Sequence, residues 1–476
     1  MLSFVKKHPI ETAVLVGIVF LVVWRIVAWY FPLNGAKTAS FFDGDISFSI
    51  QELLRSETQG EVKIRGNAEG ENLVVNAPNA SLLFSEDAGN AWQSKGQLGG
   101  WNDILVLPDG TYYIVETTIA GQNLPGTIRY RSSENPASRE IYKAGMSNNG
   151  LLGKEIRGVD IEKGTDGFWL LFREGISNEY EYKLLFSSDG VGWRDTGRVS
   201  GIKNPDELQL VSVAIDPRSN TKYITTIEWD EETVSVPGMK EYVFEANPQL
   251  MLLQKGTSVW KKLQENLGEA APGKGFSSGI PFDAKVFTDS AGNILIFWRQ
   301  HFSKPQATSF LFPLDAIKHV PILKIAYGFF ATYITKRDEI YFAKISQDGV
   351  SSDPVRLNEE ILENRQVLKL GQTGTEAMKE MQERIARYGI GVKSSVSENG
   401  QYLGAFWTDY REEGKKPLYL SYSKDGGKTW SKNQAIYPEL SNRAIAFDIF
   451  VSNSGVIHLI FSDPRTGALY LVTGEI

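Results

Sequence analysis

The eight residues SKDGGKTW, Ser423–Trp430, place an acid, two glycines and a tryptophan in one short stretch. SEDAGNAW, Ser85–Trp92, has the same frame: Ser, any residue, Asp, any residue, Gly, any two residues, Trp. SSDGVGW, Ser187–Trp193, is one residue shorter between Asp and Trp, and SQDGVSS, Ser346–Ser352, lacks the Trp. Each copy follows a short alternating apolar run, which is the pattern of a strand that enters a tight turn.

The residue types in these turns predict a structural role. Asp and Ser side chains accept backbone N–H groups and close a turn, and Gly takes the positive φ that other residues resist. The Trp then provides a large apolar anchor. The residues predicted to hold the turns are Ser85, Asp87, Gly89, Trp92, Asp189, Trp193, Ser423, Asp425, Gly427 and Trp430.

A second pattern recurs along the chain: an apolar strand, a Gly or Asn turn, and another apolar strand that ends in charged residues. Its turns are centred on Gly110, Gly167, Asn220, Gly292, Gly400 and Gly455. In most units a third strand, the Asp-containing turn and a fourth strand follow. Such units are typical of β-propeller blades, which stack around an axis because one blade cannot bury both faces of its sheet. The sequence therefore predicts an all-β, six-bladed propeller over residues 61–476. Seven blades is the alternative, because Glu61–Trp92 contains more strand than ring closure needs.

At blade level the sequence resembles the Asp-box (bacterial neuraminidase repeat) proteins of the sialidase superfamily. WTDYREEGKKPLYLSYSKDGGKTW, Trp407–Trp430, is similar to their recurrent blade, and the resemblance covers about residues 61–476. It implies a propeller that acts on or binds glycans. In that superfamily three arginines hold the substrate carboxylate, and a tyrosine–glutamate pair and an aspartate carry out catalysis. The Phe/Tyr-Arg-Ile-Pro motif of the superfamily has no counterpart here; the nearest string is IRGN, Ile64–Asn67.

Composition excludes several classes of function. The chain has 476 residues, a net charge of −7 and no cysteine, so a nucleic-acid surface is not expected, and disulfides, thiolate metal sites and a Cys nucleophile are excluded. The four histidines show no metal-binding spacing, and no Asp-x-Asp-x-Asp-Gly loop supports calcium in the acidic region. We therefore expect no cofactor and no metal, and a calcium ion in the acidic region is the alternative that no motif supports.

The N-terminal segment predicts a membrane anchor. The apolar run Ile10–Phe31 is long enough to cross a bilayer, and Lys6 and Lys7 precede it, which places the N-terminus in the cytoplasm and the rest outside, in the periplasm or at the cell surface. The predicted divisions are a cytoplasmic tail (1–9), an anchor (10–32), a linker (33–60) and the propeller. A cleaved signal peptide is the alternative, although its apolar region is normally shorter. Arg25 within the run either snorkels outward or pairs with another membrane subunit.

Blade topology indicates where a site would lie. In a four-stranded antiparallel blade the loop between strands 2 and 3 and the start of strand 1 lie at one end, and the Asp-containing turns lie at the other. Charged residues at the first end are candidates for two tasks: arginines can clamp an anionic group, and carboxylates can act on a glycosidic bond. The candidate catalytic residues are Asp103, Glu116, Glu228 and Tyr410, and the candidate substrate-binding residues are Arg173, Arg299, Arg411 and Arg465. The structural alternative is that such charges form ion pairs that lock neighbouring blades.

Two insertions, at about 301–338 and 358–390, are predicted at the same end. The first contains the apolar stretch Phe310–Ile334, which is either a self-packed flap or a docking surface for a protein partner or the membrane. The second contains Thr375–Gly389, whose apolar residues recur at helical spacing. The sequence thus supports two functions: a membrane-anchored sialidase-like propeller that acts on or binds acidic glycans, as a glycoside hydrolase if it is an enzyme, or a non-catalytic envelope scaffold that docks protein partners.

Overall fold

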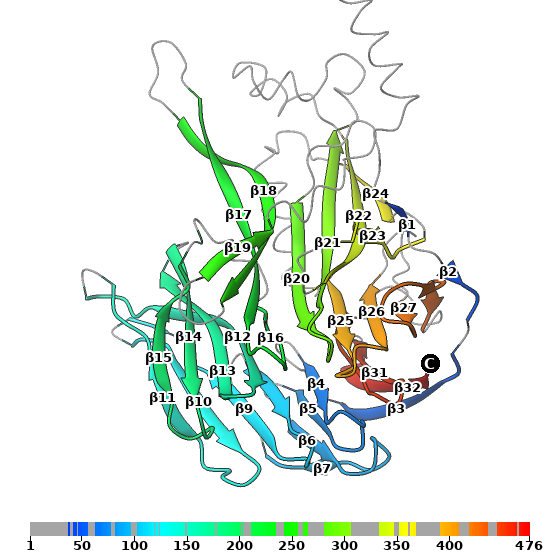
Figure 1. Ribbon diagram of the computed structural model, residues 1–476, viewed down its shortest axis with the longest axis horizontal. Helices are drawn as coiled ribbons and strands as arrows, with labels where there is room; N and C mark the ends of the chain where they lie inside the picture. The colour runs from blue at the N-terminus through cyan, green and yellow to red at the C-terminus, as the bar shows by residue number, and fades with distance from the viewer. Residues whose placement is uncertain are drawn as a thin grey trace, which may run out of the picture.

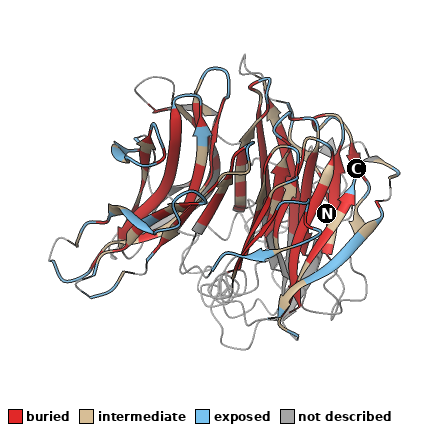
Figure 2. Cartoon of the chain, turned by 90° about the horizontal axis from the view of Figure 1, so that it is seen from below, coloured by how far each residue is buried: buried red, intermediate tan, exposed pale blue. Residues whose placement is uncertain are grey.

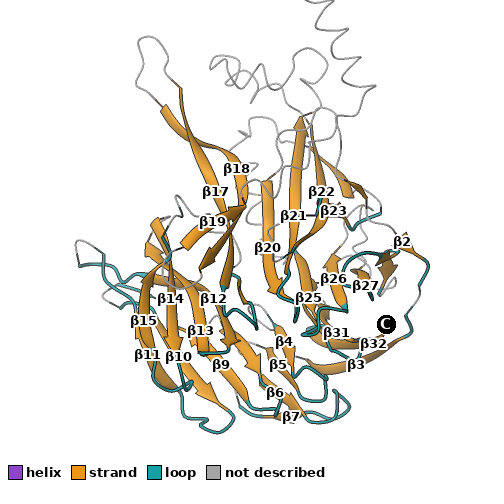
Figure 3. Ribbon diagram, viewed as in Figure 1, coloured by secondary structure: helices purple, strands orange, loops and turns teal. Residues whose placement is uncertain are grey.

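Each of the six apolar hairpins found in the sequence forms the first two strands of a separate antiparallel sheet in the computed structural model (Figure 1). A further sheet precedes them, so the ring has seven blades. The structure describes residues 37–38, 41–55, 62–264, 280–305, 333–367, 391–408 and 418–476, without 45, 78–80, 97–101, 119, 123, 148–149, 177–178, 201, 203–210, 235–241, 256–259, 347–351, 360–361, 437–444 and 464–465. Within these residues the secondary structure is β throughout and contains no helix (Figure 3).

The first four blades follow one another along the chain. Blade 1 contains β4 (Lys63–Gly66), β5 (Leu73–Ala77), β6 (Ser81–Ser85) and β7 (Gln93–Ser94). Blade 2 contains β8 (Asn102–Val106), β9 (Tyr112–Thr117), β10 (Thr127–Ser132) and β11 (Arg139–Lys143). Blade 3 contains β12 (Glu155–Gly164), β13 (Gly167–Ile176), β14 (Glu179–Ser187) and β15 (Arg194–Arg198). Blade 4 contains β16 (Val213–Ile215), β17 (Lys222–Val234), β18 (Tyr242–Lys255) and β19 (Trp260–Gln264).

Blades 5 and 6 have additional strands, whereas the C-terminal part of the chain supplies only three strands to blade 7. Blade 5 contains β20 (Ile280–Thr288), β21 (Ile294–Pro305), β22 (Tyr333–Ile345) and β23 (Val355–Arg356), and β24 (Leu362–Val367) pairs with the first half of β22. Blade 6 contains β25 (Val392–Val396), β26 (Leu403–Thr408), β27 (Leu418–Ser423) and β29 (Gln434–Ala435), with β28 (Trp430–Ser431) beside it. Blade 7 contains β30 (Ile445–Val451), β31 (Val456–Asp463) and β32 (Ala468–Glu475).

The N-terminal segment supplies the strand that closes the ring. β3 (Phe48–Arg55) pairs antiparallel with β32 and completes blade 7. Before it, β1 (Lys37–Thr38) pairs with β23 of blade 5 and β2 (Phe41–Phe42) pairs with β28 of blade 6, both in parallel. Residues 37–55, which we call the strap, therefore lie along three successive blades at the edge of the ring (Figure 1).

The prediction of six blades is wrong, and the alternative of seven is correct. Residues 62–94 form a complete blade instead of the strand that closes the ring. The segment expected to be a linker contains the strap strands. The predicted anchor, the insertion residues 310–332 and the predicted helix at Thr375–Gly389 lie outside the described residues, so the N-terminal and helical parts of the fold prediction stay predictions. Tyr333 and Ile334 belong to β22.

The core consists of seams between blades. The described buried apolar side chains form seven clusters, and each cluster joins two consecutive blades around the ring. The cluster that joins blade 7 to blade 1, for example, packs Leu469 and Leu471 against Ile64 and Val75. Figure 2 shows the same arrangement as buried strands in successive sheets. Burial at roughly 25 cal/mol per Å² of apolar surface makes these seams the main source of stability.

The Ser-Asp-Gly-Trp turns have the hydrogen bonds predicted from their residue types. In blade 6, Asp425 Oδ1 accepts from the backbone N–H groups of Lys428 at 3.0 Å and Thr429 at 2.9 Å, and the Trp430 indole donates to the Gly427 carbonyl at 3.2 Å. Gly427 has φ +87°. The turns in blades 1 and 3 have the same indole bond.

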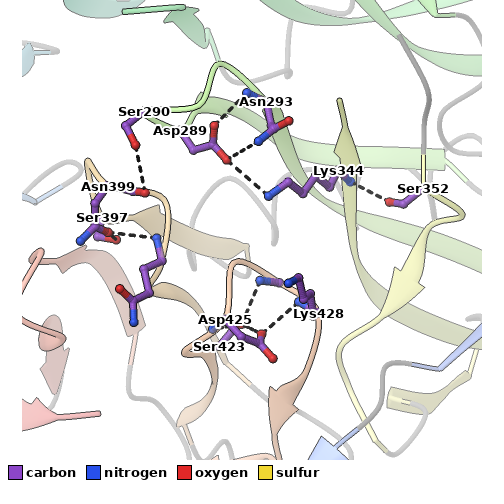
Figure 4. Close-up of polar contacts among 12 residues, drawn as sticks. Asp289, Ser290, Asn293, Lys344, Ser352, Ser397, Asn399, Ser423, Asp425 and Lys428 are labelled. Atoms are coloured by element: carbon purple, nitrogen blue, oxygen red, sulfur yellow. Dashed lines mark hydrogen bonds and ion pairs between the residues drawn. The ribbon is translucent and has the colours of Figure 1, made fainter. Parts of the chain in front are cut away.

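These turns lie at the same end of the ring as the turns between strands 1 and 2. In Figure 4 the turns of blades 5 and 6 come together around Asp289, Asn399 and Asp425. The Gly426 N–H in the Asp-containing turn donates to the Gln401 carbonyl in the neighbouring turn at 2.9 Å. We call this the turn end of the ring. The loops between strands 2 and 3 and the connections between blades lie at the opposite end, which we call the loop end.

Candidate functional site

The structure describes the side chains of two predicted catalytic carboxylates, Glu116 and Asp103, and each has different partners. Glu116 on β9 pairs with Arg131 on the neighbouring β10, with 3.2 Å between Oε1 and Nε, so its charge is used inside blade 2. Asp103 on β8 is 1% exposed and belongs to a different group of charges, described below. Glu228 lies in β17, where its side chain is not described, and Tyr410 lies outside the described residues.

The two described arginines of the predicted clamp lie in different sheets. Arg173 on β13 of blade 3 is buried, and its guanidinium lies 6.0 Å from the ring of Tyr182. Arg299 on β21 of blade 5 is also buried, and it pairs with Asp283 at 3.4 Å. Arg411 and Arg465 lie outside the described residues. Of the described candidates, Asp103 and Glu116 lie in blade 2, Arg173 in blade 3 and Arg299 in blade 5.

One group of described charged residues comes together at the axis of the ring. The first strands of all seven blades, β4, β8, β12, β16, β20, β25 and β30, contact one another in succession. Seven charged side chains from five of them form one electrostatically connected group, which we call the axial ring. Its members are Lys63, Arg65, Asp103, Asp160, Glu162, Lys285 and Asp448.

Three acids of the axial ring join one blade to the next. Each accepts a hydrogen bond from a backbone N–H on the first strand of the following blade: Asp103 from Ile161 at 2.9 Å, Asp160 from Val213 at 2.6 Å and Asp448 from Ile64 at 3.2 Å. Ser212 and Ser395 make the same bond to Val286 and Val451. Because inner strands of a propeller have no strand partner on the axial side, these bonds satisfy donors that a sheet ladder would otherwise pair.

The cations of blade 1 neutralise two of these acids. Lys63 Nζ donates to Asp103 Oδ1 at 2.9 Å. Arg65 lies 3.7 Å from the same oxygen and also donates a hydrogen bond to Asp448, so its guanidinium bridges blades 7 and 2. Burial acts against the charge of Asp103, but the Lys63 and Arg65 charges outweigh it and hold the pKa of Asp103 below its ordinary value.

Glu162 and Lys285 are placed differently from the rest of the axial ring. Within the described part of the chain neither side chain has a hydrogen bond or an ion pair, and both residues remain partly exposed. The Lys285 ammonium lies 4.9 Å from the ring of Phe287. Burial, and after it the charge of Asp103, raises the pKa of Glu162 to about 7. Burial, and after it the charge of Arg65, lowers the pKa of Lys285. The Glu162 carboxyl, which titrates near neutral pH, and the Lys285 ammonium thus both lie at the axis. Neither group donates or accepts a hydrogen bond with a described residue.

This arrangement is suited to holding an anion. Lys285 and Arg65 are close enough to repel each other, and an anionic group between two cations relieves that repulsion. A protonated Glu162 donates a hydrogen bond to such a group, whereas an ionised Glu162 repels it. Among the described residues no group of three His, Asp or Glu side chains is arranged to hold a metal ion.

The sequence contains a signal for the axial ring that single-motif searches miss. In five first strands a charged residue directly precedes an Ile or Val: Lys63, Asp103, Asp160, Lys285 and Asp448. Ser212 precedes Val213 in the same way in blade 4. An alignment of the first strands of the blades puts these residues at equivalent positions. Such an alignment would have added Lys63 and Lys285 to the candidate site residues.

The chain is similar to solved structures but matches no family model. No family model and no curated protein matches the chain, so the sialidase-type resemblance stays a prediction. Among solved structures, the chain is similar to YCF48 from Cyanidioschyzon merolae (11% identity, TM-score 0.38, covering 90% of this chain and 98% of that one) and to an ulvan lyase of a polysaccharide lyase family (11%, 0.46, 94% and 96%). It is also similar to an endo-arabinase from Bacteroides thetaiotaomicron (16%, 0.28, 67% and 93%). Two of these three proteins carry the name of an enzyme, and YCF48 does not.

In the part of the chain that the structure describes, no helix has the length and apolar character needed to cross a membrane.

Proposed function

We propose that this protein binds acidic glycans at the axis of its propeller. The observation that carries the proposal is the axial ring, in which cations from blades 1 and 5 lie around a carboxyl group that titrates near neutral pH. The ligand class follows from the chemistry: a uronate, sialate or sulfate group supplies the anion, and sugar hydroxyls supply further hydrogen bonds to polar side chains.

Lys285 is the residue to test. It has no described ion pair, so its removal takes an ion-pair partner from no described acid. Removal of Arg65, in contrast, takes the ion-pair partner from Asp448 and one of two cations from Asp103. Loss of one charge-assisted contact costs roughly 1.5–3 kcal/mol, and about 1.4 kcal/mol is a tenfold change in affinity. We therefore expect Lys285→Met to weaken binding of an acidic oligosaccharide by about tenfold or more.

The experiment compares polyuronate, sialylated and sulfated oligosaccharides with neutral dextran fragments by calorimetry. Lys163→Met is the matched control, because Lys163 lies on β12 next to Glu162 but is exposed. Equal affinity for acidic and neutral chains, or equal loss in the two variants, would contradict the proposal. The same mixtures are analysed for released sugars and for unsaturated products, which report hydrolysis and elimination.

The proposal includes the predicted location. Residues 10–32 anchor the chain and the propeller lies outside the cytoplasmic membrane. The alternative function, a non-catalytic scaffold that docks a protein partner at Phe310–Ile334, is tested by pull-down with full-length protein and a variant without residues 310–332. Loss of a partner in the variant, together with no glycan binding by the full chain, would favour the scaffold.

A further inference from the structure

An exposed apolar platform lies at the loop end of blades 2 and 3. Five large hydrophobic side chains are exposed in the described part of the chain, and three of them are Leu124, Leu151 and Leu152, at 67%, 57% and 46%. Leu124 is in the loop between strands 2 and 3 of blade 2, and the other two are in the connection from blade 2 to blade 3. Single exposed leucines are ordinary, but a group of them indicates an interaction surface.

Backbone hydrogen bonds hold the two loops of the platform together. The 121–124 turn is closed by Gly121 N–H to the Leu124 carbonyl at 2.7 Å, and the 147–152 turn by Ser147 N–H to the Leu152 carbonyl at 2.7 Å. Gly153 N–H donates to the Gly121 carbonyl at 3.2 Å and joins the two turns. A Cβ at Gly153 would lie 2.2 Å from the Leu124 carbonyl oxygen, so only glycine fits there. These bonds hold the backbone of Leu124 next to that of Leu152 and Gly153.

We propose that this platform, defined by Leu124, Leu151 and Leu152, docks onto the lipid surface of the membrane that holds the chain. The composition favours lipid over a protein partner: protein interfaces concentrate their binding energy in Trp, Tyr and Arg, and leucine is under-represented among such residues. The platform leucines are aliphatic, and the exposed Lys143 lies at the end of β11, where the connection begins. Aliphatic side chains with a neighbouring cation suit the boundary between acyl chains and headgroups.

The predicted anchor keeps the propeller close to a lipid surface. The strap begins at Lys37, and residues 10–32 are the predicted anchor, so few residues separate the propeller from the bilayer. A short tether gives a high effective concentration of lipid surface, which makes a weak contact sufficient. The inference rests on the anchoring included in the proposed function, but it does not require glycan binding.

The absence of cysteine allows a direct test with the full-length chain. Leu151→Cys, labelled with an environment-sensitive fluorophore, is reconstituted in vesicles of phosphatidylcholine and phosphatidylglycerol. The matched control is Val191→Cys, which is 51% exposed in the Asp-containing turn of blade 3, at the turn end. We expect the probe at 151 to shift to the blue and to be quenched by spin-labelled lipid, and the probe at 191 to report water.

The outcomes separate the two hypotheses. If the full chain fails to float with the vesicles, the anchoring is wrong and the docking falls with it. If the chain floats and the probe at 151 reports water, the docking is wrong and the anchoring stands. A probe at 151 that becomes buried only when a protein partner is added also overturns lipid docking. Leu124→Cys gives an independent second position, so the result does not depend on one labelled site.

Discussion

The tryptophans of the Ser-Asp-Gly-Trp turns connect a local motif to the packing of the ring. Trp430 is buried, and its ring lies 5.2 Å from that of Phe342 and 6.0 Å from that of Phe297, both in blade 5. Trp193 of blade 3 packs in the same way on Tyr130 of blade 2. Each turn therefore holds an aromatic anchor against the preceding blade, and the turn's hydrogen bonds fix the direction of that anchor.

Replacement of Asp425 by alanine tests this arrangement. Asp425→Ala removes the acceptor for two backbone N–H groups and for the Thr429 hydroxyl at 2.7 Å, so we expect a loss of about 1–3 kcal/mol in the free energy of unfolding. Thermal unfolding of the variant measures it. Lys428→Ala is the control, because its exposed side chain is removed while its N–H remains, and it should change stability by no more than about 0.5 kcal/mol. A variant at Asp425 as stable as this control would show that the turn does not depend on the carboxylate.

The residue types were enough to predict the turns, but they did not show which charged residues have a structural role and which are available to a ligand. The turn bonds join residues at most four positions apart, as in Ser423 with Gly427, so the local sequence contains all their partners. Asp103 takes its partners from Lys63 and Ile161, which belong to other blades. Its role depends on the order of blades around the axis, and a charge taken by itself suggests a catalytic acid as readily as a structural one.

At the scale of elements, the strap determines how the ring closes. β3 has seven residue pairs with β32, from Phe48 with Gly474 to Arg55 with Ala468. Its sequence, FSIQELLR, lacks the alternation of a half-buried strand because its side chains are mostly exposed or half-buried at the edge of the ring. The sequence therefore identified every hairpin that starts a blade from the second blade onward, but it missed the closing strand, whose partner lies more than 400 positions away.

Truncation separates the role of the strap from that of the predicted anchor. A chain that begins at residue 57 lacks β3 and exposes the edge of β32, and at a net value of about 1 kcal/mol for each lost hydrogen bond we expect several kcal/mol of destabilisation. A chain that begins at residue 37 keeps all strap strands and should unfold at a clearly higher temperature. Hydrogen exchange adds a local measurement: amides of β32 should exchange faster only in the shorter chain. Equal unfolding temperatures and equal exchange would mean that blade 7 is stable without its fourth strand.

At the scale of the whole molecule, the axial ring combines a structural role and a candidate binding role. Asp103, Asp160 and Asp448 accept N–H groups from the next blade, so they contribute to closure of the ring. Glu162 and Lys285 contribute no such bond among the described residues. Charges with a stabilising role and charges available to a ligand thus lie within one group, which is why charge patterns alone could not separate them.

Glu162 gives the last prediction, which concerns the dependence of stability on pH. The pKa of Glu162 is about 7 in the folded protein, whereas its ordinary value, which applies to the unfolded chain, is 4.5. Between pH 4.5 and pH 7 the folded chain therefore holds a proton that the unfolded chain has lost. The contribution of Glu162 to stability therefore falls as the pH rises from about 4.5 to 7 and stays low above that. Glu162→Gln, which is neutral at every pH, should be more stable than the natural chain at pH 8, by an amount on the order of 2 kcal/mol, and no more stable at pH 4.

The difference in unfolding temperature between variant and natural chain, measured at both pH values, tests this sign. Glu398→Gln, at an exposed position in a turn of blade 6, is the control and should give the same small difference at both. If Glu162→Gln is destabilising at pH 8, the carboxylate is ionised and paired, and the electrostatics described for the axis are wrong. If Glu162→Gln is stabilising at pH 8, protonation of Glu162 should also be linked to ligand binding. In the natural chain an anion at the axis should bind more tightly as the pH falls through 7. The variant should lose this pH dependence, because an uncharged residue 162 neither repels the anion nor takes up a proton.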